Sequence, residues 1–424
     1  MFSNIFKFGW RNLTRNRRRT FLTVFAITVG VLSLVFAGSY IRGILNNVVE
    51  TSIKTQTGHI RIAHEEYLRM ERILPKEYLV TGLKQLQQTI STFPGIESIE
   101  KRLKFNVLLN HGDVNEAGLA VGIEPNVTDK NMNLSKAIIK GSYFGRNGEK
   151  PDLIIGKKLA EKLGVTINDE LLLVTTDINY STYALPFNVS GIFETGYSYM
   201  DKHSIYIPLE KAQEMLDCGD AAHEVLIFLN DPDQSRVIAA EIKKSLSKSN
   251  QGQGIRVIPW QEDDMIKNMP TIIAIWDKIL LIIMFIVALV ILNTMLMSVM
   301  ERYHEIGVLK ALGFKNREVF LMIMVEAFYL GVIGSVIGGI LGGTISAIFE
   351  KVGFEMTKFA GGIMDKIDIP MPFFGTVLYP DLTFSILAGS IAFGVIVALA
   401  AVLYPAFKSI RMQPVEAFRS ELKV

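Results

Sequence analysis

The chain has 424 residues, of which 49% are hydrophobic and 20% are charged. A formal net charge of +2 gives no reason to expect nucleic-acid binding, and the single cysteine, Cys218, excludes an internal disulfide framework. The positive mean hydropathy fits either several soluble domains or a membrane protein with one soluble domain. The distribution of the hydrophobic residues decides between these two.

Residues 1–20 form a basic segment without acidic residues. Its cations are Lys7, Arg11, Arg15, Arg17, Arg18 and Arg19. Apolar residues such as Phe6 and Trp10 recur near one face of a helix, which predicts a cytoplasmic amphipathic segment along the inner membrane surface. A basic tail that only sets topology is an equally good interpretation.

Four long stretches lack Asp, Glu, Lys and Arg. They are Phe21–Ile41, Ile279–Met300, Ala327–Phe349 and Leu382–Phe407. A bilayer core of ~30 Å needs ~20 helical residues to cross it. A buried core helix of a soluble protein would normally carry a polar stripe. We therefore predict transmembrane helices at 21–41, 271–300, 320–349 and 382–407, the first as a retained anchor rather than a signal peptide.

The positive-inside rule places the basic N-terminal segment in the cytoplasm. Counting spans then puts the remaining segments alternately outside and inside: 42–270 outside, 301–319 inside, 350–381 outside and 408–424 inside. The predicted fold class is an α-helical membrane protein with four transmembrane helices and a large extracytoplasmic α/β domain between the first and second.

The outer region alternates between strand and helix patterns. Gly58–Ala63 and Ile255–Pro259 have strand periodicity, Val80–Phe93 has helical spacing, and Asp152–Val165 is typical of a strand that enters a helix ending at Gly164. Further strands are expected in 170–229, with a short helix in Pro208–Leu216. We predict two subdomains, one from approximately 46–100 with 222–270 and the other from 101–221.

Catalytic signals are weak. The sequence contains no G-x-x-x-x-G-K-[ST] phosphate loop, and Gly145–Lys150 lacks its spacing. The six histidines are scattered, and Cys218 has no evident catalytic partner. We therefore expect no catalytic residues, no metal site and no cofactor bound by this chain, and a membrane-anchored enzyme becomes a poor interpretation.

The third span carries two rows of small residues four positions apart. One row is Gly334, Gly338 and Gly342, and the neighbouring row is Gly331, Ser335, Gly339 and Gly343. Small residues let helix backbones approach closely in lipid, so we predict helix packing on two sides of this span. Glu326 near its cytoplasmic end is expected to be hydrated or to snorkel.

A charged segment, Met300–Phe320, separates the second and third spans. Glu301, Glu305, Val308, Leu309 and Leu312 recur at helical spacing, and Gly313 is a predicted stop. The pattern is typical of a short cytoplasmic docking helix; a loop that only fixes topology is the alternative.

This segment resembles the FtsX-like permeases of the macrolide-exporter and lipoprotein-release (MacB, FtsX and LolCE, or type VII) class of ABC transporters. Their "ER-x-x-EIG-x-L-(K/R)-A-LG" signature is matched by Glu301, Arg302, Glu305, Ile306, Gly307, Leu309, Lys310, Ala311, Leu312 and Gly313. The third span, the tail Tyr404–Glu421, and the outer ranges Ile154–Leu173 and Val189–Leu216 are also similar to this class.

The resemblance implies a permease without its own motor. A separate ATPase dimer would bind ATP and dock on Glu301, Arg302, Glu305, Gly307 and Lys310, while a second permease protomer, the same or different, completes the transporter. Outer-domain movement by mechanotransmission would then release a lipoprotein or export another envelope substrate, with a periplasmic lipoprotein carrier or adaptor as a further partner. The implied location is the bilayer of a bacterial inner membrane, where the chain is multi-pass.

Two non-transport alternatives share this layout: a membrane receptor, and a regulator of an envelope hydrolase. A receptor would normally carry a signalling domain in the cytoplasm, whereas only short segments of this chain are expected there.

Overall fold

A computed structural model of the chain describes residues 17–145, 150–248, 254–264, 266–267, 269–300, 303–355 and 377–411. The chain divides into two compact units. Unit 1 comprises residues 1–46, 270–354 and 378–424, and unit 2 comprises residues 47–269 and 355–377.

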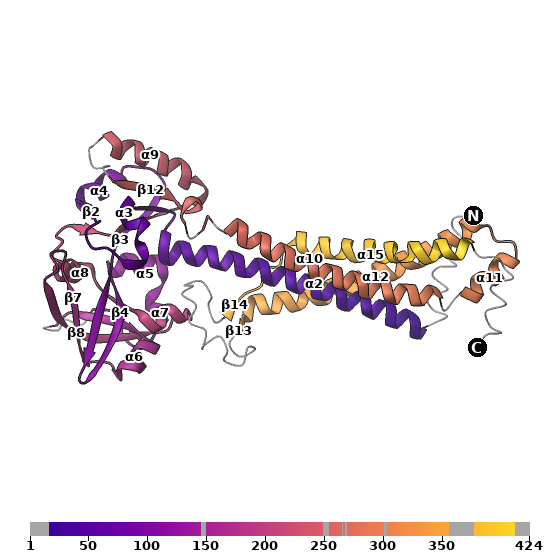
Figure 1. Ribbon diagram of the computed structural model, residues 1–424, viewed down its shortest axis with the longest axis horizontal. Coiled ribbons are helices and arrows are strands. Elements are labelled where there is room, and N and C mark those ends of the chain that lie inside the picture. Colours follow the sequence, from indigo (N-terminus) through magenta and orange to yellow (C-terminus); the bar gives the residue numbers. More distant parts are fainter. Residues whose placement is uncertain are drawn as a thin grey trace. The chain divides into compact units, whose positions relative to one another are not determined.

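Unit 1 is built from four long helices that run alongside one another (Figure 1). They are α2 (Arg17–Ser52), α10 (Met269–Met300), α12 (Asn316–Val352) and α15 (Phe384–Arg411), and the short α11 (Tyr303–Ala311) lies between α10 and α12 in the chain. All four long helices are long and apolar enough to cross a membrane. A two-stranded pair, β13 (Phe354–Glu355) with β14 (Val377–Leu378), lies between α12 and α15 in the chain.

Helix α12 packs through its small residues on two sides. A Cβ atom on Gly338 would lie 2.6 Å from the carbonyl oxygen of Thr28 on α2, and Gly334 and Gly342 face the same helix. The neighbouring row faces α15: Gly331 approaches Ala398, and Gly339 approaches the side chain of Ile391. Thr28 also donates from its hydroxyl to the Gly334 carbonyl over 3.1 Å, which fixes the register of α2 on α12.

The end of α2 within unit 1 is fastened to the segment that precedes α15. Asp381 accepts from Asn46 Nδ2 at 2.6 Å and from Arg42 Nε at 3.3 Å. Its own N–H donates to the Ser39 carbonyl, and Gly43 leaves room for the backbone of residues 379–381. Helices α2, α12 and α15 are therefore held together along their lengths, whereas α10 contributes a single buried row: Val287, Ile291 and Met295.

Unit 2 contains a ten-stranded sheet and two short strands that pair separately. Its strands are β1 (Ile60–His64), β2 (Val80–Thr81), β3 (Ile96–His111), β4 (Val114–Ile123), β5 (Ile138–Gly141), β6 (Asp152–Gly156), β7 (Glu170–Thr176), β8 (Thr182–Phe193), β9 (Ser204–Pro208), β10 (Ala221–Ala222), β11 (Glu224–Leu229) and β12 (Ile255–Pro259). The main sheet runs in the order β12-β1-β11-β3-β4-β9-β6-β8-β5, and β7 pairs with both β3 and β8. These pairings close strands β3, β4, β9, β6, β8 and β7 into a ring.

In the part of unit 2 that the structure describes, seven α-helices pack around these strands: α3 (Glu65–Arg69), α4 (Leu83–Ile90), α5 (Pro125–Met132), α6 (Lys157–Leu163), α7 (Ser198–His203), α8 (Leu209–Leu216) and α9 (Ser235–Lys248). The four-stranded part β12-β1-β11-β3 buries one apolar face under α4 and α9, through Leu86, Ile90, Ile238 and Ile242. A second core fills the ring, and Phe105 and Phe187 lie within it fully buried. A third apolar cluster, which includes Ile123, Ile154 and Phe193, packs against the same sheet.

The local structure departs from expectation at three places. The helix expected over Val80–Phe93 begins only at Leu83, because residues 80–81 pair with β10 and Gly82 adopts a left-handed conformation. The long β3–β4 hairpin was not expected. Glu326, expected to be hydrated or to snorkel, is only 5% exposed within α12, so that expectation was wrong.

The two glycine rows generate a test of helix packing. Gly338→Leu should destabilise the chain by on the order of 1–2 kcal/mol or more, because a backbone carbonyl of α2 blocks the new side chain. Gly339→Leu should cost less, because the side chain of Ile391 can change rotamer. Thermal unfolding of the purified chain in detergent measures both. Gly389→Leu is the matched control, since nothing lies within 4 Å of a Cβ atom there; equal melting of Gly338→Leu and this control would contradict the packing role.

Candidate functional site

The first candidate site is the short connection between α10 and α12. Helix α11 ends in a Schellman motif: the Gly313 N–H donates to the Lys310 carbonyl at 3.1 Å, and the Phe314 N–H donates to the Leu309 carbonyl at 3.2 Å. Gly313 has φ +93°, a conformation that favours glycine, so the predicted stop at this residue is confirmed.

Helix α12 starts only three residues after Gly313. The Glu318 side chain accepts the backbone N–H of Lys315 at 2.9 Å, and this bond satisfies a donor at the N-terminus of the helix. Because α11 and α12 are both capped within a four-residue connection, a displacement of α11 cannot be absorbed by a long flexible loop.

The residues predicted to couple to an ATPase lie in or before α11. Gly307 is buried, whereas Glu305 and Lys310 are partly exposed, and both of these charged residues interact within the chain. Glu301 and Arg302 lie outside the described residues, as do 1–16, most of the predicted loop 350–381, and the tail from 412 onward. The coupling role of all five residues stays a prediction.

The second candidate site is a charged face of the sheet in unit 2. Alternation along β3 places Glu100, Arg102 and Lys104 on the face opposite the apolar core of Ile99. Glu224 on β11 is the direct cross-strand partner of Arg102, and Arg61 on β1 is paired with Leu226, two residues from Glu224. We call Arg61, Glu100, Arg102, Lys104 and Glu224 the charged face; all five side chains are buried.

The charges of this face are paired rather than isolated. Glu224 Oε2 lies 2.6 Å from Arg61 Nη2, and Glu224 Oε1 lies 2.5 Å from Lys104 Nζ. Burial alone would raise the pKa of Glu224, but Arg61, Lys104 and Arg102 outweigh burial and lower this pKa to about 2. The carboxylate therefore stays ionised, and removing one partner would leave an uncompensated buried charge.

His223 lies beside the charged face as a neutral ring. Its Nδ1 accepts the backbone N–H of Lys104 at 3.1 Å, so Nε2 carries the proton and donates to the Pro75 carbonyl at 3.0 Å. The ring also stacks on Tyr67 with centroids 4.6 Å apart. Burial lowers the pKa of His223 to about 4, although Glu224 and Glu71 nearby favour the charged form.

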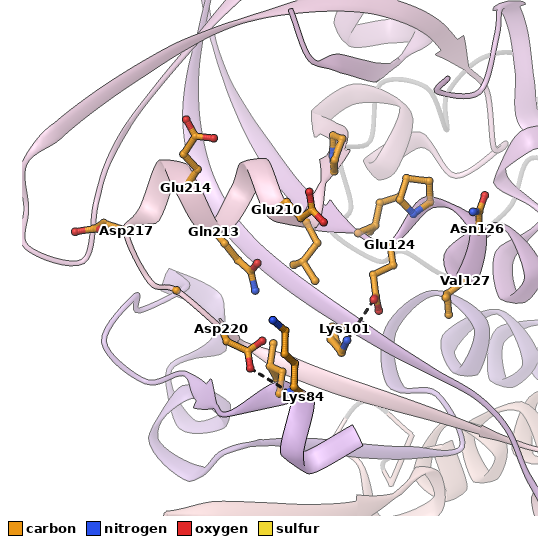
Figure 2. Close-up of a pocket in the computed structure, with 16 residues that line it drawn as sticks. Lys84, Lys101, Glu124, Asn126, Val127, Glu210, Gln213, Glu214, Asp217 and Asp220 are labelled. Atoms are coloured by element: carbon orange, nitrogen blue, oxygen red, sulfur yellow. Dashed lines mark hydrogen bonds and ion pairs between the residues drawn. The ribbon is translucent and has the colours of Figure 1, made fainter. Parts of the chain in front are cut away.

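A groove of about 910 Å³ opens elsewhere in unit 2 (Figure 2). Lys84, Lys101 and Gln213 point into it, and Lys101 pairs with Glu124 at 3.2 Å. Its other charged lining residues are Glu210, Glu214, Asp217 and Asp220. This lining differs from the mostly apolar walls typical of small-molecule sites. Among the residues that the structure describes, no group of three His, Cys, Asp or Glu side chains could hold a metal ion.

Sequence reasoning missed the charged face. The signal was present as Glu100, Arg102 and Lys104 at alternate positions, a period that places all three on one side of a strand. Alternating charges normally indicate a solvated face, and the partners that bury them come from distant parts of the chain: Glu224 pairs with Lys104 and also with Arg61, 163 positions before it.

The buried histidine and glutamate predict the acid response of unit 2. Both groups have pKa values lowered by folding, so both contribute stability that is lost as pH falls. Between about pH 6.5 and 4, His223 should remove on the order of 3 kcal/mol, and Glu224 should remove a similar amount between about pH 4.5 and 2. His223→Gln should flatten the first phase, because an amide can make similar bonds without titrating.

Denaturant unfolding at several pH values measures this response. Trp260, which lies in unit 2, can report it once Trp10 and Trp276 are replaced by Phe. His111→Gln, at the far end of β3, is the control and should keep the parent response. An unchanged first phase in His223→Gln would show that another group causes it.

Comparisons with known proteins bear on the whole chain. Residues 20–245 match the family model described as MacB-like periplasmic core domain, and residues 278–414 match FtsX-like permease C-terminal. The chain is 23% identical to the lipoprotein-releasing system transmembrane protein LolC of Xylella fastidiosa over 97% of this chain and 98% of that protein. It is also 23% identical to the macrolide export ATP-binding/permease protein MacB of Psychrobacter arcticus, over 83% of this chain but only 53% of that protein.

Among solved structures, the periplasmic region of MacB from Actinobacillus actinomycetemcomitans is similar to this chain with a TM-score of 0.37 and 14% identity. The matched region covers 52% of this chain and 95% of the chain in that structure. One family match covers α2 and most of unit 2, the other covers α10 to α15, and four helices are suited to cross a membrane. The chain is therefore a multi-pass membrane protein that belongs to the ABC transporter permeases of the LolC and MacB type, with a MacB-like periplasmic core domain and an FtsX-like permease region.

Proposed function

We propose that this permease serves lipoprotein release. A separate ATPase subunit binds the α11 region in the cytoplasm, and ATP hydrolysis moves unit 2 on the other side of a bacterial inner membrane. That movement extracts a lipoprotein from the outer leaflet and passes it to a periplasmic carrier or adaptor. Two permease protomers, identical or different, and an ATPase dimer form the complete transporter.

The end-to-end match to LolC carries the choice of substrate. LolC is named as part of a lipoprotein-releasing system, and the alignment covers 98% of its length. The MacB relative includes an ATP-binding function in its name, and nearly half of it has no counterpart in this chain. Membership of the same family also allows a less specific alternative, in which the permease exports another envelope substrate.

Mechanical coupling is supported by the membrane helices. Helix α2 is unbroken from Arg17 to Ser52, so residues of both units belong to one helix. The connection from α11 to α12 is short and capped at both ends. The stretch Ile279–Met300 of α10 carries no charged residue, which favours movement of the outer domain over an ion pathway through the spans.

If the motor is a separate subunit, the purified chain should not hydrolyse ATP. The reason is the missing phosphate loop, whose backbone N–H groups would cradle the nucleotide. Phosphate release is measured on protein shown by mass spectrometry to be free of other ATPases. Turnover above a heat-denatured control would remove the motorless permease from consideration.

Charge reversal in α11 tests docking. Glu305→Lys should weaken binding of the ATPase at least ~10-fold or uncouple hydrolysis from transport, because an inverted interfacial charge can cost several kcal/mol. Glu305→Gln should have a smaller effect, since it removes the charge without inverting it. Pull-down and lipoprotein-release assays at matched expression measure both. Glu350→Lys, the same reversal at the exposed far end of α12, is the control; parental docking and release by Glu305→Lys would exclude α11 from the mechanism.

A further inference from the structure

Unit 2 is joined to the membrane helices by two segments that meet the same charged face. One is the π-helical turn η1 (Ile53–Thr57), which continues directly from α2. The other is the segment from Trp260 to Asp263, which follows β12 and leads toward α10. Strands β1 and β12, which adjoin these two segments in the chain, pair antiparallel from Ile60–Pro259 to His64–Ile255.

Arg102 hydrogen-bonds to the segment that continues from α2. Its guanidinium donates through Nη1 to the Thr55 carbonyl and through Nη2 to the Lys54 carbonyl at 3.3 Å. These carbonyls belong to the last turn of the helix, where backbone acceptors lack helical partners and the helix dipole is negative. Glu100 Oε1 lies 2.6 Å from Arg102 Nε and holds the guanidinium in place, and Thr128 and Asn131 on α5 bond Glu100 in turn.

Arg61 forms an ion pair with the segment that leads to α10. Its Nη1 lies 3.3 Å from Asp263 Oδ2, and the Asp263 side chain is only 2% exposed. The Asp263 carbonyl accepts the N–H groups of Ile266 and Lys267 at 2.9 and 2.7 Å, so this residue also closes the turn toward Met269. Arg61 is held on its other side by Glu71 and Glu224.

Glu224 lies between the Arg61 contacts and the Arg102 contacts. Its carboxylate contacts Arg61 through one oxygen and Lys104 through the other, and Lys104 Nζ reaches Gln56 Oε1 in η1 at 3.5 Å. Arg102 lies directly across from Glu224 in the strand register. Ion pairs therefore lead from Asp263 through Arg61 and Glu224 to Lys104 across three adjacent strands, and Lys104 reaches η1 through the Gln56 amide. Because guanidinium and carboxylate groups pair in fixed planar geometry, this path resists shear better than apolar packing does.

We propose that Arg61, Glu224 and Arg102 are positioning residues that couple the unit 2 end of α2 to the segment entering α10. A displacement of either helix then reaches the other through buried ion pairs in unit 2. In the transporter this coupling converts movement of the helices into movement of the whole domain, and that consequence rests on the proposed function. The coupling itself is a property of the chain alone.

Hydrogen exchange on the full chain in detergent, without an ATPase, tests the coupling. Asp263→Asn should speed exchange of the amides of Ile53–Gly58 about 10-fold, because it weakens the ion pair with Arg61 at the other end of the path. In a Glu224→Gln background, the further effect of Asp263→Asn should fall below about twofold, because the path is already broken. If Glu224→Gln does not fold, Arg102→Lys provides the second background, since it keeps the charge and loses the planar fork.

The control is Asp152→Asn, which alters a buried acid on β6 outside the charged face and should leave Ile53–Gly58 unchanged. Unchanged exchange in Asp263→Asn, or equal effects with and without Glu224, would overturn the coupling. A uniform acceleration throughout unit 2 would also overturn it, because that result indicates general destabilisation.

A second readout separates this inference from the proposed function. With an ATPase subunit bound, Glu224→Gln should keep docking and hydrolysis and lose at least ~10-fold in lipoprotein release, whereas a general folding defect would lower all three. If the hydrogen-exchange results show the coupling but the chain binds no ATPase, the proposed function is contradicted and the inference stands. Normal release by Glu224→Gln at matched expression would sink the inference alone.

Discussion

A helix that leaves a membrane and enters a folded domain ends with carbonyl groups that have no helical partner, and they must find donors inside protein. In this chain Arg102 supplies those donors to Lys54 and Thr55. A buried guanidinium requires anions, and the neighbouring Glu100 and Glu224 provide them. Glu224 in turn requires Arg61 and Lys104. The charged face follows from this one requirement at the end of α2.

The membrane unit satisfies a different constraint. Apolar helices in lipid gain little from burying apolar surface, so close backbone approach must hold them together. The glycines of α12 allow that approach to α2 on one side and α15 on the other, and Asp381 fastens α2 to the start of α15. Helices α10 and α15 are both less buried than α2 and α12, and α10 leads to α11 in the chain.

The sequence was sufficient where the signal is local. Charge-free runs predicted the four long helices, and the positive φ of Gly313 confirms the predicted end of α11. Contacts between residues far apart in the chain could not be predicted from the sequence. In the sequence alone, the alternating charges of β3 are typical of a solvent-exposed face, because the partners that bury them come from β1 and β11. Glu326 likewise is buried by neighbouring helices that its own span cannot reveal. Glu301 and Arg302, which complete the family signature, lie outside the described residues, so their placement remains a prediction.

We propose that ATP turnover in another subunit moves unit 2 relative to the membrane helices. It is tested most directly by a distance measurement between spin labels at Tyr180 in unit 2 and Phe384 at the start of α15, two exposed positions. Replacing Cys218 by Ser removes the only native thiol. In the complex reconstituted with its ATPase, the account predicts that the distance distribution shifts between the nucleotide-free and ATP-trapped states. An identical distribution in both states, in a complex that hydrolyses ATP and releases its substrate, would contradict it.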